Sequence, residues 1–549
     1  MIDSIYKGQF GKEVAALPET TFTAISNLKS ETVNFEGKAV NVLGYYAKGD
    51  GGGGLFYWDA ASAEADNGGT IIQATAVTTG RWKRVFSGAV NVKWFGAKGD
   101  GVTDDTSKII SALASLGTGG GLHFSKGEYD LKDFSIPSNI TITANRDAKL
   151  SVTGSISISG SEKITLEGVH INSLYAVHII NLTNAKDITI LKCYINGNGF
   201  IGDSVQTSGA VGGIRGIDCS NVSIKDSEIC NFRTGQAILF KSSTDCVVEG
   251  NYVHHSGRAG ISISSNNNGC KVINNRCHFN VANFTVSDGA IDLYGSYNKN
   301  TLIEGNIVTS YGSLTSLAVG IRIKGSHNTK CYNNTVYAST YSFSMFYVQD
   351  RDSVIDEYVE ISSNTAILEA GSRTFYVLRV VNGKNIIIKN NLVDVQGTLS
   401  ESVSTAFEFR FNVNNLDFSG NIINASKDPS AISNAVRFHS SGTSYENISI
   451  TDNKIDVGGI GILASKCKNF TINGNVLKGI SSTNDLIHIS DSENGFVYHN
   501  TINGPNSIIY NAPSNINVIV GERPPIQNTD TPYLTEAAMH ADQANQLEG

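Results

Sequence analysis

A short phrase that ends in asparagine recurs ten times between residues 251 and 500. In each copy, strand-like apolar residues precede a small or polar residue and the asparagine, as in VVEGN, LIEGN and TINGN. Successive copies are 22 to 32 residues apart, and the segments between them vary in sequence and length. The ten asparagines are Asn251, Asn275, Asn306, Asn334, Asn364, Asn391, Asn421, Asn453, Asn475 and Asn500.

A phrase with this spacing predicts stacked coils, because each unit is too short to enclose a core and must pack on its neighbours. Asparagine suits the recurring position for two reasons. It tolerates the left-handed backbone of a sharp bend, and its amide can hydrogen-bond to the copies above and below it. The pattern therefore predicts an all-β fold, a parallel β-helix whose coils are joined by an asparagine ladder.

The composition agrees with this fold and excludes several functions. The chain has 549 residues, of which 17% are charged and 56 are glycine, which is typical of turn-rich β proteins. Its net charge of −8 argues against a nucleic-acid partner and would repel a strongly acidic polymer unless local basic columns compensate. No stretch of 18 apolar residues exists, so we expect no membrane insertion. The first residues, MIDSIYKGQFGKEV, lack the apolar core of a signal peptide.

The eight cysteines all lie between Cys193 and Cys467, and they show neither a CxxC motif nor a Cys–His spacing typical of metal ligands. Cys277 takes a position where neighbouring repeats have valine, which indicates an inward apolar site. We expect reduced, buried cysteines, no metal and no cofactor. This in turn indicates synthesis in a reducing cytoplasm.

The pattern divides the chain into three expected parts. Residues 1–88 do not share the repeat and have strand-like pieces between glycine-rich turns, which predicts a small N-terminal β domain. Residues 89–520 are expected to form the parallel β-helix with a helix cap at its N-terminal end. Residues 521–549 depart from the repeat again and are interpreted as a C-terminal linker or cap.

The expected capping helix follows the sequence DDT at 104–106, which offers N-cap residues. Ile109, Ile110, Leu113 and Leu116 then repeat at helical spacing before the glycines at 119–121 end the pattern. Such a helix would cover the apolar cross-section that the end of a solenoid otherwise exposes.

The region around this helix resembles a known family. GAKGDGVTDDT, the helix and GGGLHFSKGEYDL are similar to the N-terminal motif of the pectate-lyase-like superfamily of right-handed β-helices, a motif common in bacteriophage tailspikes. The preceding NVLGYYAKGDGGGGLFYWDA and GRWKRVF resemble the small domain ahead of the β-helix in phage depolymerases. The motifs cover residues 35 to 131, and the resemblance implies a right-handed parallel β-helix with a particle-proximal N-terminal domain.

A second recurring strand in each coil supplies the first group of candidate site residues. Its outward positions align as two columns, one with Asp292 and Arg322 and the other with Tyr294 and Lys324, while Arg258 falls beside Asp288. Stacking is expected to bring these six residues to one exposed surface. Glycoside hydrolysis needs two carboxyl groups that flank the scissile bond, with cations and aromatic rings to bind the sugar. We therefore interpret Asp288 and Asp292 as catalytic, with a separation in the inverting range, and the other four as substrate-binding. The alternative is a set of cross-strand ion pairs on a solvated face.

Glu249 and Glu304 form a second candidate catalytic pair. Both precede a ladder asparagine by two positions, with Ile273 on the coil between them. They should therefore lie roughly 9.6 Å apart, near the upper end for an inverting pair. The alternative is that they are ordinary surface carboxylates.

His254 and His255 are adjacent, and on a regular strand their side chains would point to opposite faces. Without a bend they cannot bind the same ion. We therefore interpret His254 as substrate-binding rather than as a metal ligand.

The resemblance implies a tailspike in the virion tail that binds and depolymerises a bacterial surface polysaccharide, capsule or O-antigen. It implies a homotrimer, attached to a phage tail or baseplate protein through the N-terminal region and made in the host bacterial cytoplasm. Trimer contacts would cover outward apolar residues, for which we expect Leu239, Phe346, Phe407, Phe409 and Phe411. Hydrolysis is favoured. The alternatives are a polysaccharide lyase, with Lys324, Tyr294 or His254 as base and Arg322 as carboxylate partner, and a non-catalytic receptor-binding spike.

Overall fold

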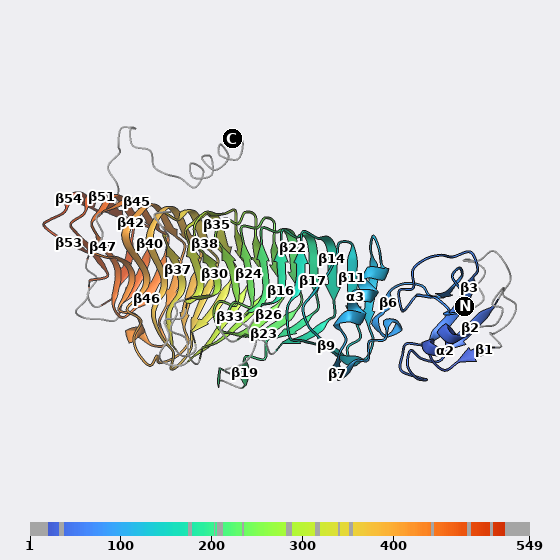
Figure 1. Cartoon of the computed structure of the whole chain (residues 1–549). Coiled ribbons are helices and arrows are strands. Elements are labelled where there is room, and N and C mark those ends of the chain that lie inside the picture. The colour runs from blue at the N-terminus through green and yellow to red at the C-terminus, as the bar shows by residue number, and fades with distance from the viewer. Residues whose placement is uncertain are drawn as a thin grey trace, which may run out of the picture. The chain divides into compact units, whose positions relative to one another are not determined.

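The computed structural model describes residues 20–31, 38–173, 178–201, 204–205, 212–232, 235–281, 288–312, 319–338, 341–350, 355–440, 444–479, 485–504 and 509–521. Strands dominate these residues, and the predicted all-β class with its parallel β-helix is confirmed (Figure 1). The chain forms two compact units, Met1–Ser157 with Ser161–Asn172 and Ile158–Gly160 with Ser173–Gly549. The expected C-terminal linker at 521–549 lies outside the described residues except for Gly521.

The first unit opens with a five-stranded sheet in the order β1-β2-β3-β5-β4. Its elements are β1 (Thr20–Phe22), α2 (Ile25–Ser30), β2 (Ala39–Val42), β3 (Gly54–Asp59), β4 (Ile71–Ile72) and β5 (Arg81–Arg84). The sheet and α2 enclose a small apolar core that includes Leu28, Val40, Phe56 and Trp82, all with exposures of 1% or less. The first strand after this sheet begins at Val90.

The remainder of the first unit has short strands and one longer helix. Its elements are β6 (Val90–Asn91), η1 (Val92–Phe95), β7 (Asp100–Asp104), α3 (Thr106–Ser115), β8 (Gly120–Phe124), β9 (Gly127–Leu131), β10 (Phe134–Ser135), β11 (Ile140–Ala144), β12 (Ala148–Val152), β13 (Ile156–Ser159), β14 (Glu162–Glu167) and β15 (His170–Ser173). Helix α3 packs against η1 and β10 and buries Ile109 and Leu113. Ile110 was expected on the same apolar stripe, but it is 48% exposed because it lies on the outer side of the helix.

Two parallel sheets form the second unit, and they stack coil upon coil in Figure 1. In this unit the large sheet consists of β16 (His178–Thr183), β17 (Lys186–Leu191), β21 (Gly212–Ile217), β22 (Ser220–Lys225), β24 (Ile238–Lys241), β25 (Val247–Glu249), β27 (Ile261–Ser264), β28 (Lys271–Ile273), β30 (Gly289–Tyr294), β31 (Asn298–Lys299), β32 (Leu302–Glu304), β34 (Val319–Lys324), β35 (Ser326–Tyr332), β37 (Tyr341–Gln349), β38 (Glu357–Ser362), β40 (Arg373–Lys389), β42 (Thr405–Ser419), β44 (Asn434–Phe438), β45 (Tyr445–Thr451), β47 (Ile460–Ser465), β48 (Cys467–Asn473), β50 (Ile487–Ser490), β51 (Glu493–Tyr498), β53 (Ile509–Asn511) and β54 (Ile516–Val520).

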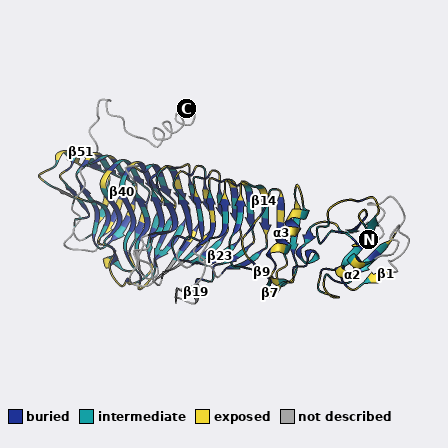
Figure 2. Cartoon of the chain, in the orientation of Figure 1, coloured by how far each residue is buried: buried dark blue, intermediate teal, exposed yellow. Residues whose placement is uncertain are grey.

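The small sheet of this unit consists of β18 (Tyr194–Asn196), β23 (Glu228–Phe232), β26 (Tyr252–Ser256), β29 (Arg276–Val281), β33 (Ile307–Gly312), β36 (Thr335–Ala338), β39 (Thr365–Leu368), β41 (Leu392–Val395), β43 (Ile422–Asn424), β46 (Lys454–Val457), β49 (Val476–Gly479) and β52 (Thr501–Asn503). A hairpin of β19 (Phe200–Ile201) and β20 (Ser204–Val205) and a 3-10 turn, η2 (Pro429–Ala431), complete the unit. Alternate strand residues point inward and are buried, which Figure 2 shows as dark bands along the coils.

The predicted asparagine ladder is confirmed, and its hydrogen bonds explain why the residue recurs. The side-chain oxygen of Asn391 accepts from both the backbone N–H and the side-chain amide of Asn364, at 3.0 Å each. The amide of Asn391 donates to the carbonyl of Ile361 and to the oxygen of Asn421, at 2.9 Å each. The same paired bonds of 2.8–3.0 Å run from Asn251 to Asn500.

The left-handed backbone lies one residue earlier than expected. Each ladder asparagine follows a residue with φ between 51° and 68°, and the asparagine itself does not adopt this conformation. The ten left-handed residues are Gly250, Asn274, Gly305, Asn333, Ser363, Asn390, Gly420, Asp452, Gly474 and His499. The two properties of asparagine are thus divided between neighbouring positions, since the bend is made by one residue and the buried bonds by the next.

Replacing Asn391 with alanine should lower the free energy of unfolding by about 2–4 kcal/mol, because the buried N–H of Asn364 and carbonyl of Ile361 lose their partners. Chemical denaturation followed by circular dichroism measures this loss. Asn503→Ala is the matched control, because Asn503 is exposed and does not belong to the ladder. Equal losses in the two variants would contradict a stabilising role for the ladder.

A second row of polar side chains lines another bend of the coil. The backbone N–H of Asn267 donates to the side-chain oxygen of Asn298 at 3.2 Å. Two coils further on, the backbone N–H and hydroxyl of Ser326 donate to Oδ1 of Asp356 at 2.7 and 3.0 Å. Asp356 is completely buried, and its Oδ2 has no partner among the described residues. Burial raises the pKa of this carboxyl well above its usual value, although the two Ser326 bonds oppose the shift.

Asp356→Asn should therefore raise the melting temperature, and the gain should be larger at pH 8 than at pH 5. A raised pKa in the folded state means that wild-type stability falls as pH rises toward that pKa, whereas an amide does not titrate. Differential scanning calorimetry at the two pH values measures the gain. Asp491→Asn, at an exposed position, serves as the control and should leave the melting temperature unchanged. An Asp356→Asn gain that is equal at both pH values would contradict the protonation argument.

Most of the aromatic residues expected on the outside lie inside the coil. Phe346, Phe407 and Phe409 are 4% exposed or less, and each pairs in register with inward residues of neighbouring strands. Phe407 and Phe409 pack edge-on against Phe418. Of the five predicted outward apolar residues, Leu239 is half-buried and Phe411 is 41% exposed. The outward apolar surface is thus different from the predicted one.

All eight cysteines are buried and none forms a disulfide, as predicted. Burial raises the pKa of the Cys277 thiol to about 12. Because the thiolate is the reactive form, this cysteine is chemically inert in the folded protein. Within the described part of the chain, no helix is both long and apolar enough to span a membrane.

Candidate active site

The predicted outward column is present in the large sheet. Ser262 pairs with Asp292, and Asp292 pairs with Arg322, so these residues lie side by side on strands β27, β30 and β34. Each strand has an inward isoleucine before the column residue and an inward apolar residue after it. This alternation fixes the outward direction of Asp292 and Arg322.

Asp288, Asp292 and the two arginines form a compact ion-pair cluster. Nη2 of Arg322 lies 2.6 Å from Oδ2 of Asp292 and 3.0 Å from Oδ1 of Asp288, and its Nε donates to Oδ1 of Asp292 at 2.7 Å. Nε of Arg258 donates to the other oxygen of Asp288 at 2.8 Å. The cluster thus links three successive coils through alternating positive and negative charges.

The cluster is more buried than the sequence indicated. The side chains of Asp288, Asp292 and Arg322 are each 4% exposed, whereas that of Arg258 is 39% exposed. The expected fully exposed surface is therefore wrong for these three residues, because Arg322 folds across both carboxylates and closes them from solvent. Burial raises the pKa of Asp292, against the opposing charge of Arg322.

The separation of the two carboxyl groups also differs from the expectation. Both oxygens lie within 3.0 Å of one nitrogen of Arg322, so they can be at most about 6 Å apart. Retaining glycosidases hold their two carboxyl groups roughly 5–5.5 Å apart, and inverting enzymes roughly 6.5–9.5 Å. The geometry of Asp288 and Asp292 is therefore closer to the retaining arrangement than to the predicted inverting one.

Tyr294 and Lys324 border the cluster on its half-buried side. The guanidinium of Arg322 lies 5.0 Å from the ring centroid of Tyr294, and Nζ of Lys324 lies 6.0 Å from it. Nζ of Lys324 also donates to Gln349 at 3.1 Å. An aromatic face beside two cations is an arrangement that can bind a polar sugar ring with an acidic substituent.

The second predicted pair lies on other strands of the large sheet. Glu249 and Glu304 both pair in register with Ile273, so the expected separation of two coils is correct. Glu249 forms an ion pair with Lys225 at 2.9 Å, and its side chain is 38% exposed. Burial raises the pKa of the Tyr332 hydroxyl, and the neighbouring carboxylate of Glu304 raises it further.

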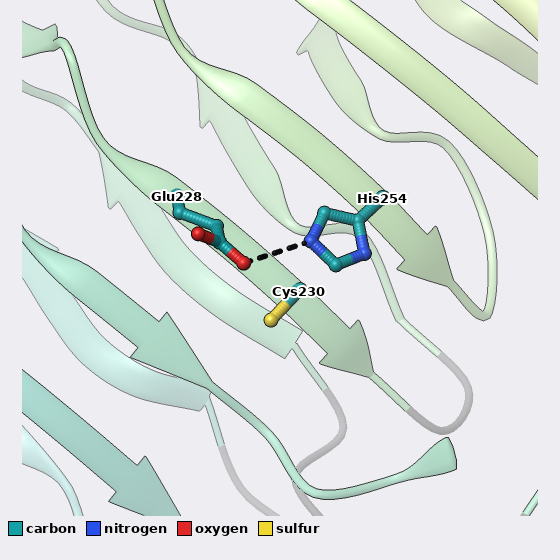
Figure 3. A group of neighbouring side chains, drawn as sticks. All are labelled: Glu228, Cys230 and His254. Atoms are coloured by element: carbon teal, nitrogen blue, oxygen red, sulfur yellow. Dashed lines mark hydrogen bonds and ion pairs between the residues drawn. The ribbon is translucent and has the colours of Figure 1, made fainter. Parts of the chain in front are cut away.

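His254 lies on β26 of the small sheet and not on the large sheet that holds the aspartate pair. Its Nε2 is 3.2 Å from Oε1 of Glu228, and the ligand atoms of Glu228, Cys230 and His254 are all within 4.8 Å of one another (Figure 3). The structure therefore places this predicted sugar-binding residue in a different group of side chains. Burial lowers the pKa of His254, against the effect of Glu228, and raises that of Cys230 to about 12.

The outward column extends beyond Arg322, which was not predicted from the sequence. The column continues in register through Tyr347, Arg379, Glu408 and Arg437. Nε of Arg379 lies 2.8 Å from Oε2 of Glu408, whose side chain is 2% exposed. Extending the alignment by four strands, β37, β40, β42 and β44, would have found these residues.

Glu408 and Arg379 form a second buried charge pair on this face. Burial raises the pKa of Glu408, although Arg379, Arg410 and Arg437 oppose the shift. The guanidinium of Arg379 also lies 4.7 Å from the ring centroid of Tyr376. The outward face from β30 to β44 is thus rich in arginine and aromatic side chains, with few acidic ones, which compensates locally for the negative net charge.

Comparison with known families agrees with the resemblance found in the sequence. Residues 21–87 match the family described as the phage tail protein small four-stranded β-sheet domain. Residues 89–312 match rhamnogalacturonase A/epimerase, pectate lyase-like. The resemblance to bacteriophage tailspikes with a pectate-lyase-like β-helix is thereby confirmed.

Several solved structures match this chain at low identity. The enzymatically active domain of tailspike protein 2 from bacteriophage CBA120 is 15% identical, with a TM-score of 0.45, and the match covers 76% of this chain and 60% of that one. The surface adhesin PfbA of Streptococcus pneumoniae is 15% identical, with a TM-score of 0.45 and coverages of 79% and 100%. Tailspike gp49 of the Acinetobacter baumannii bacteriophage Fri1, a capsular polysaccharide depolymerase, is 14% identical, with a TM-score of 0.37 and coverages of 89% and 76%. The chain thus spans less than two thirds of the CBA120 domain.

Proposed function

We propose that this protein is a phage tailspike that binds and hydrolyses a surface polysaccharide of the bacterial host, capsule or O-antigen. The observation that carries the proposal is the pair Asp288 and Asp292, held around one arginine beside the ring of Tyr294. Two carboxyl groups at this separation, with cations and an aromatic ring next to them, are the groups that glycoside hydrolysis requires. The match of residues 21–87 to a phage tail domain supports attachment to the tail or baseplate through this region.

Asp292 is the proposed general acid, because burial raises its pKa, against the opposing charge of Arg322. Asp288 is then the carboxylate that attacks the anomeric carbon, as the short separation of the pair favours retention of configuration. Arg258, Tyr294 and Lys324 bind the glycan, because they are the more accessible members of the cluster. For catalysis, the side chain of Arg322 must move from between the two carboxylates to admit the sugar.

The main alternative is a non-catalytic receptor-binding spike, and a specific observation favours it. Arg322 neutralises both aspartates in a buried cluster, which is an arrangement that also serves only to hold adjacent coils together. The same neutralisation weighs against a lyase at this position, since elimination needs a free arginine to bind the carboxylate of a uronic acid.

Asp288→Asn and Asp292→Asn should each reduce the release of reducing ends from the host polysaccharide by at least about 100-fold. The amide retains an oxygen that accepts from arginine, so both variants should fold, which their melting temperatures will show. Asp456→Asn is the matched control, because Asp456 is paired with Lys478 on the small sheet. Its rate should equal that of wild type.

Variants of the second candidate pair, Glu249 and Glu304, test the assignment of the active site to Asp288 and Asp292. Near-normal rates for both aspartate variants, combined with loss in Glu249→Gln or Glu304→Gln, would move the active site to the second pair. Binding of polysaccharide without any new reducing ends would establish the receptor-binding alternative. Ultraviolet absorbance of an unsaturated uronate in the product would establish a lyase.

We further propose that the spike is a homotrimer that forms part of the virion tail after synthesis in the host cytoplasm. The support for self-association is a stripe on the small sheet, where Ile307, Ile422 and Val476 point outward and are 41–44% exposed. These residues belong to one register column, with Thr335, Thr365, Leu392 and Lys454 between them. Buried cysteines without disulfides are consistent with a reducing compartment.

Light scattering should give a mass three times that of one chain, and Ile422→Lys should lower it, because a buried unpaired charge opposes association. Lys454→Arg, in the same column, retains the charge already present and should leave the mass unchanged. A wild-type protein with the mass of one chain would contradict the trimer.

A further inference from the structure

A group of possible metal ligands lies on the small sheet and consists of Glu228, Cys230 and His254. These residues belong neither to the aspartate cluster nor to the asparagine ladder. Glu228 and Cys230 are two residues apart on β23, so both side chains point to the same face of the small sheet. His254 pairs in register with Cys230 from the neighbouring strand β26. Figure 3 shows the contact between Glu228 and His254, with the sulfur of Cys230 close to it.

We propose that these three side chains bind a zinc ion that links two successive coils. Thiolate, imidazole and carboxylate are the three ligand types that zinc takes in proteins, and three protein ligands leave a fourth position for water. The ligand atoms already lie within 4.8 Å of one another, and the Glu228–His254 distance is 3.2 Å. Zinc bond lengths of roughly 2.0–2.3 Å place ligand atoms about 3.5 Å apart in a tetrahedron. The distances need to shorten by at most about 1.3 Å, which small rotations of the three side chains can supply.

The surroundings hold His254 in the orientation that a metal ligand needs. Its ring stacks on Tyr252 with a centroid distance of 4.3 Å and an interplanar angle of 29°. Its Nδ1 lies 2.6 Å from Nδ1 of His255. When Nε2 of His254 binds the metal, its Nδ1 carries the proton and donates a hydrogen bond to Nδ1 of His255. Such a partner on the second ring nitrogen fixes the tautomer of metal-binding histidines.

The contact between the rings of His254 and His255 depends on a left-handed backbone conformation, which was not predicted from the sequence. His255 has φ of 51°, so the chain bends and brings its side chain to that of His254 instead of to the opposite face. Left-handed residues other than glycine occur at many bends of this protein, and the one at His255 brings the two imidazole rings together. The two histidine side chains therefore lie together, contrary to the expectation for a regular strand.

The sulfur has its own polar neighbour. The side-chain amide of Asn231 donates to Sγ of Cys230 at 3.4 Å and to the side-chain oxygen of Asn196 at 3.0 Å. A hydrogen bond to sulfur stabilises a metal-bound thiolate, and the thiol proton passes to solvent when zinc binds. Cys230 itself is fully buried, so the sulfur is shielded from competing oxidants.

The experiment uses the full-length chain without an affinity tag, freed of metal by a chelator and then dialysed. Calorimetric titration with zinc should give one ion per chain, and zinc should raise the melting temperature because it binds only the folded site. Cobalt should produce a thiolate-to-metal charge-transfer band in the near ultraviolet. Cobalt serves as the probe because zinc has no such spectrum.

Cys230→Ser should abolish the charge-transfer band and weaken zinc binding more than about 100-fold, and His255→Ala should weaken it about 10- to 100-fold. His327→Gln is the matched control. His327 also faces a glutamate, Glu357, at 3.6 Å, and it does not belong to the three-ligand group, so its loss should change neither quantity. Circular dichroism checks that every variant is folded.

Two outcomes would overturn the proposal. The first is a wild-type protein that shows no cobalt–thiolate band. The second is a folded Cys230→Ser variant that binds zinc with unchanged affinity, which would place the ion at other histidines. Neither outcome depends on whether the protein cleaves a polysaccharide.

Discussion

The second unit depends on the hydrogen bonds of one buried backbone N–H group at each bend. A left-handed residue turns the chain between the large and small sheets, and the N–H group after it faces the interior, where water cannot reach it. An unpaired group there costs about 1–3 kcal/mol, and the ladder would accumulate that cost at every coil. The oxygen of the next asparagine accepts this bond, so each coil completes the hydrogen bonding of the one before it.

The ladder and the strand register could be predicted because both follow from local rules that repeat. An asparagine at a fixed place in a phrase and an alternation of apolar residues were enough to place Asp292 beside Arg322. The rule failed at Phe346, Phe407 and Phe409. Their strands, β37, β40 and β42, are longer than the others, and β40 and β42 continue through the bend. In the shorter strands a small residue marks the start. In these long strands that residue does not determine which side chains point inward.

The neighbours of Asp292 in the candidate site could be predicted, but their burial could not. Register determines which residues are neighbours, whereas exposure depends on where a long side chain folds, and Arg322 folds over both aspartates. The sequence gives no signal of this preference. The same limit applies to His255, because a single left-handed residue reverses the direction of one side chain without any change in the surrounding pattern.

The variable spacing of the ladder has a consequence for how such a protein can change. Ladder bonds join asparagines that are 22 residues apart as readily as those 32 residues apart, because the extra residues leave the coil between fixed points. An insertion in one coil therefore leaves the register of the next coil intact. Surface segments between the coils can be lengthened, shortened or exchanged by recombination while the coils themselves stay unchanged. These surface segments can therefore diverge faster in sequence than the coils that carry them.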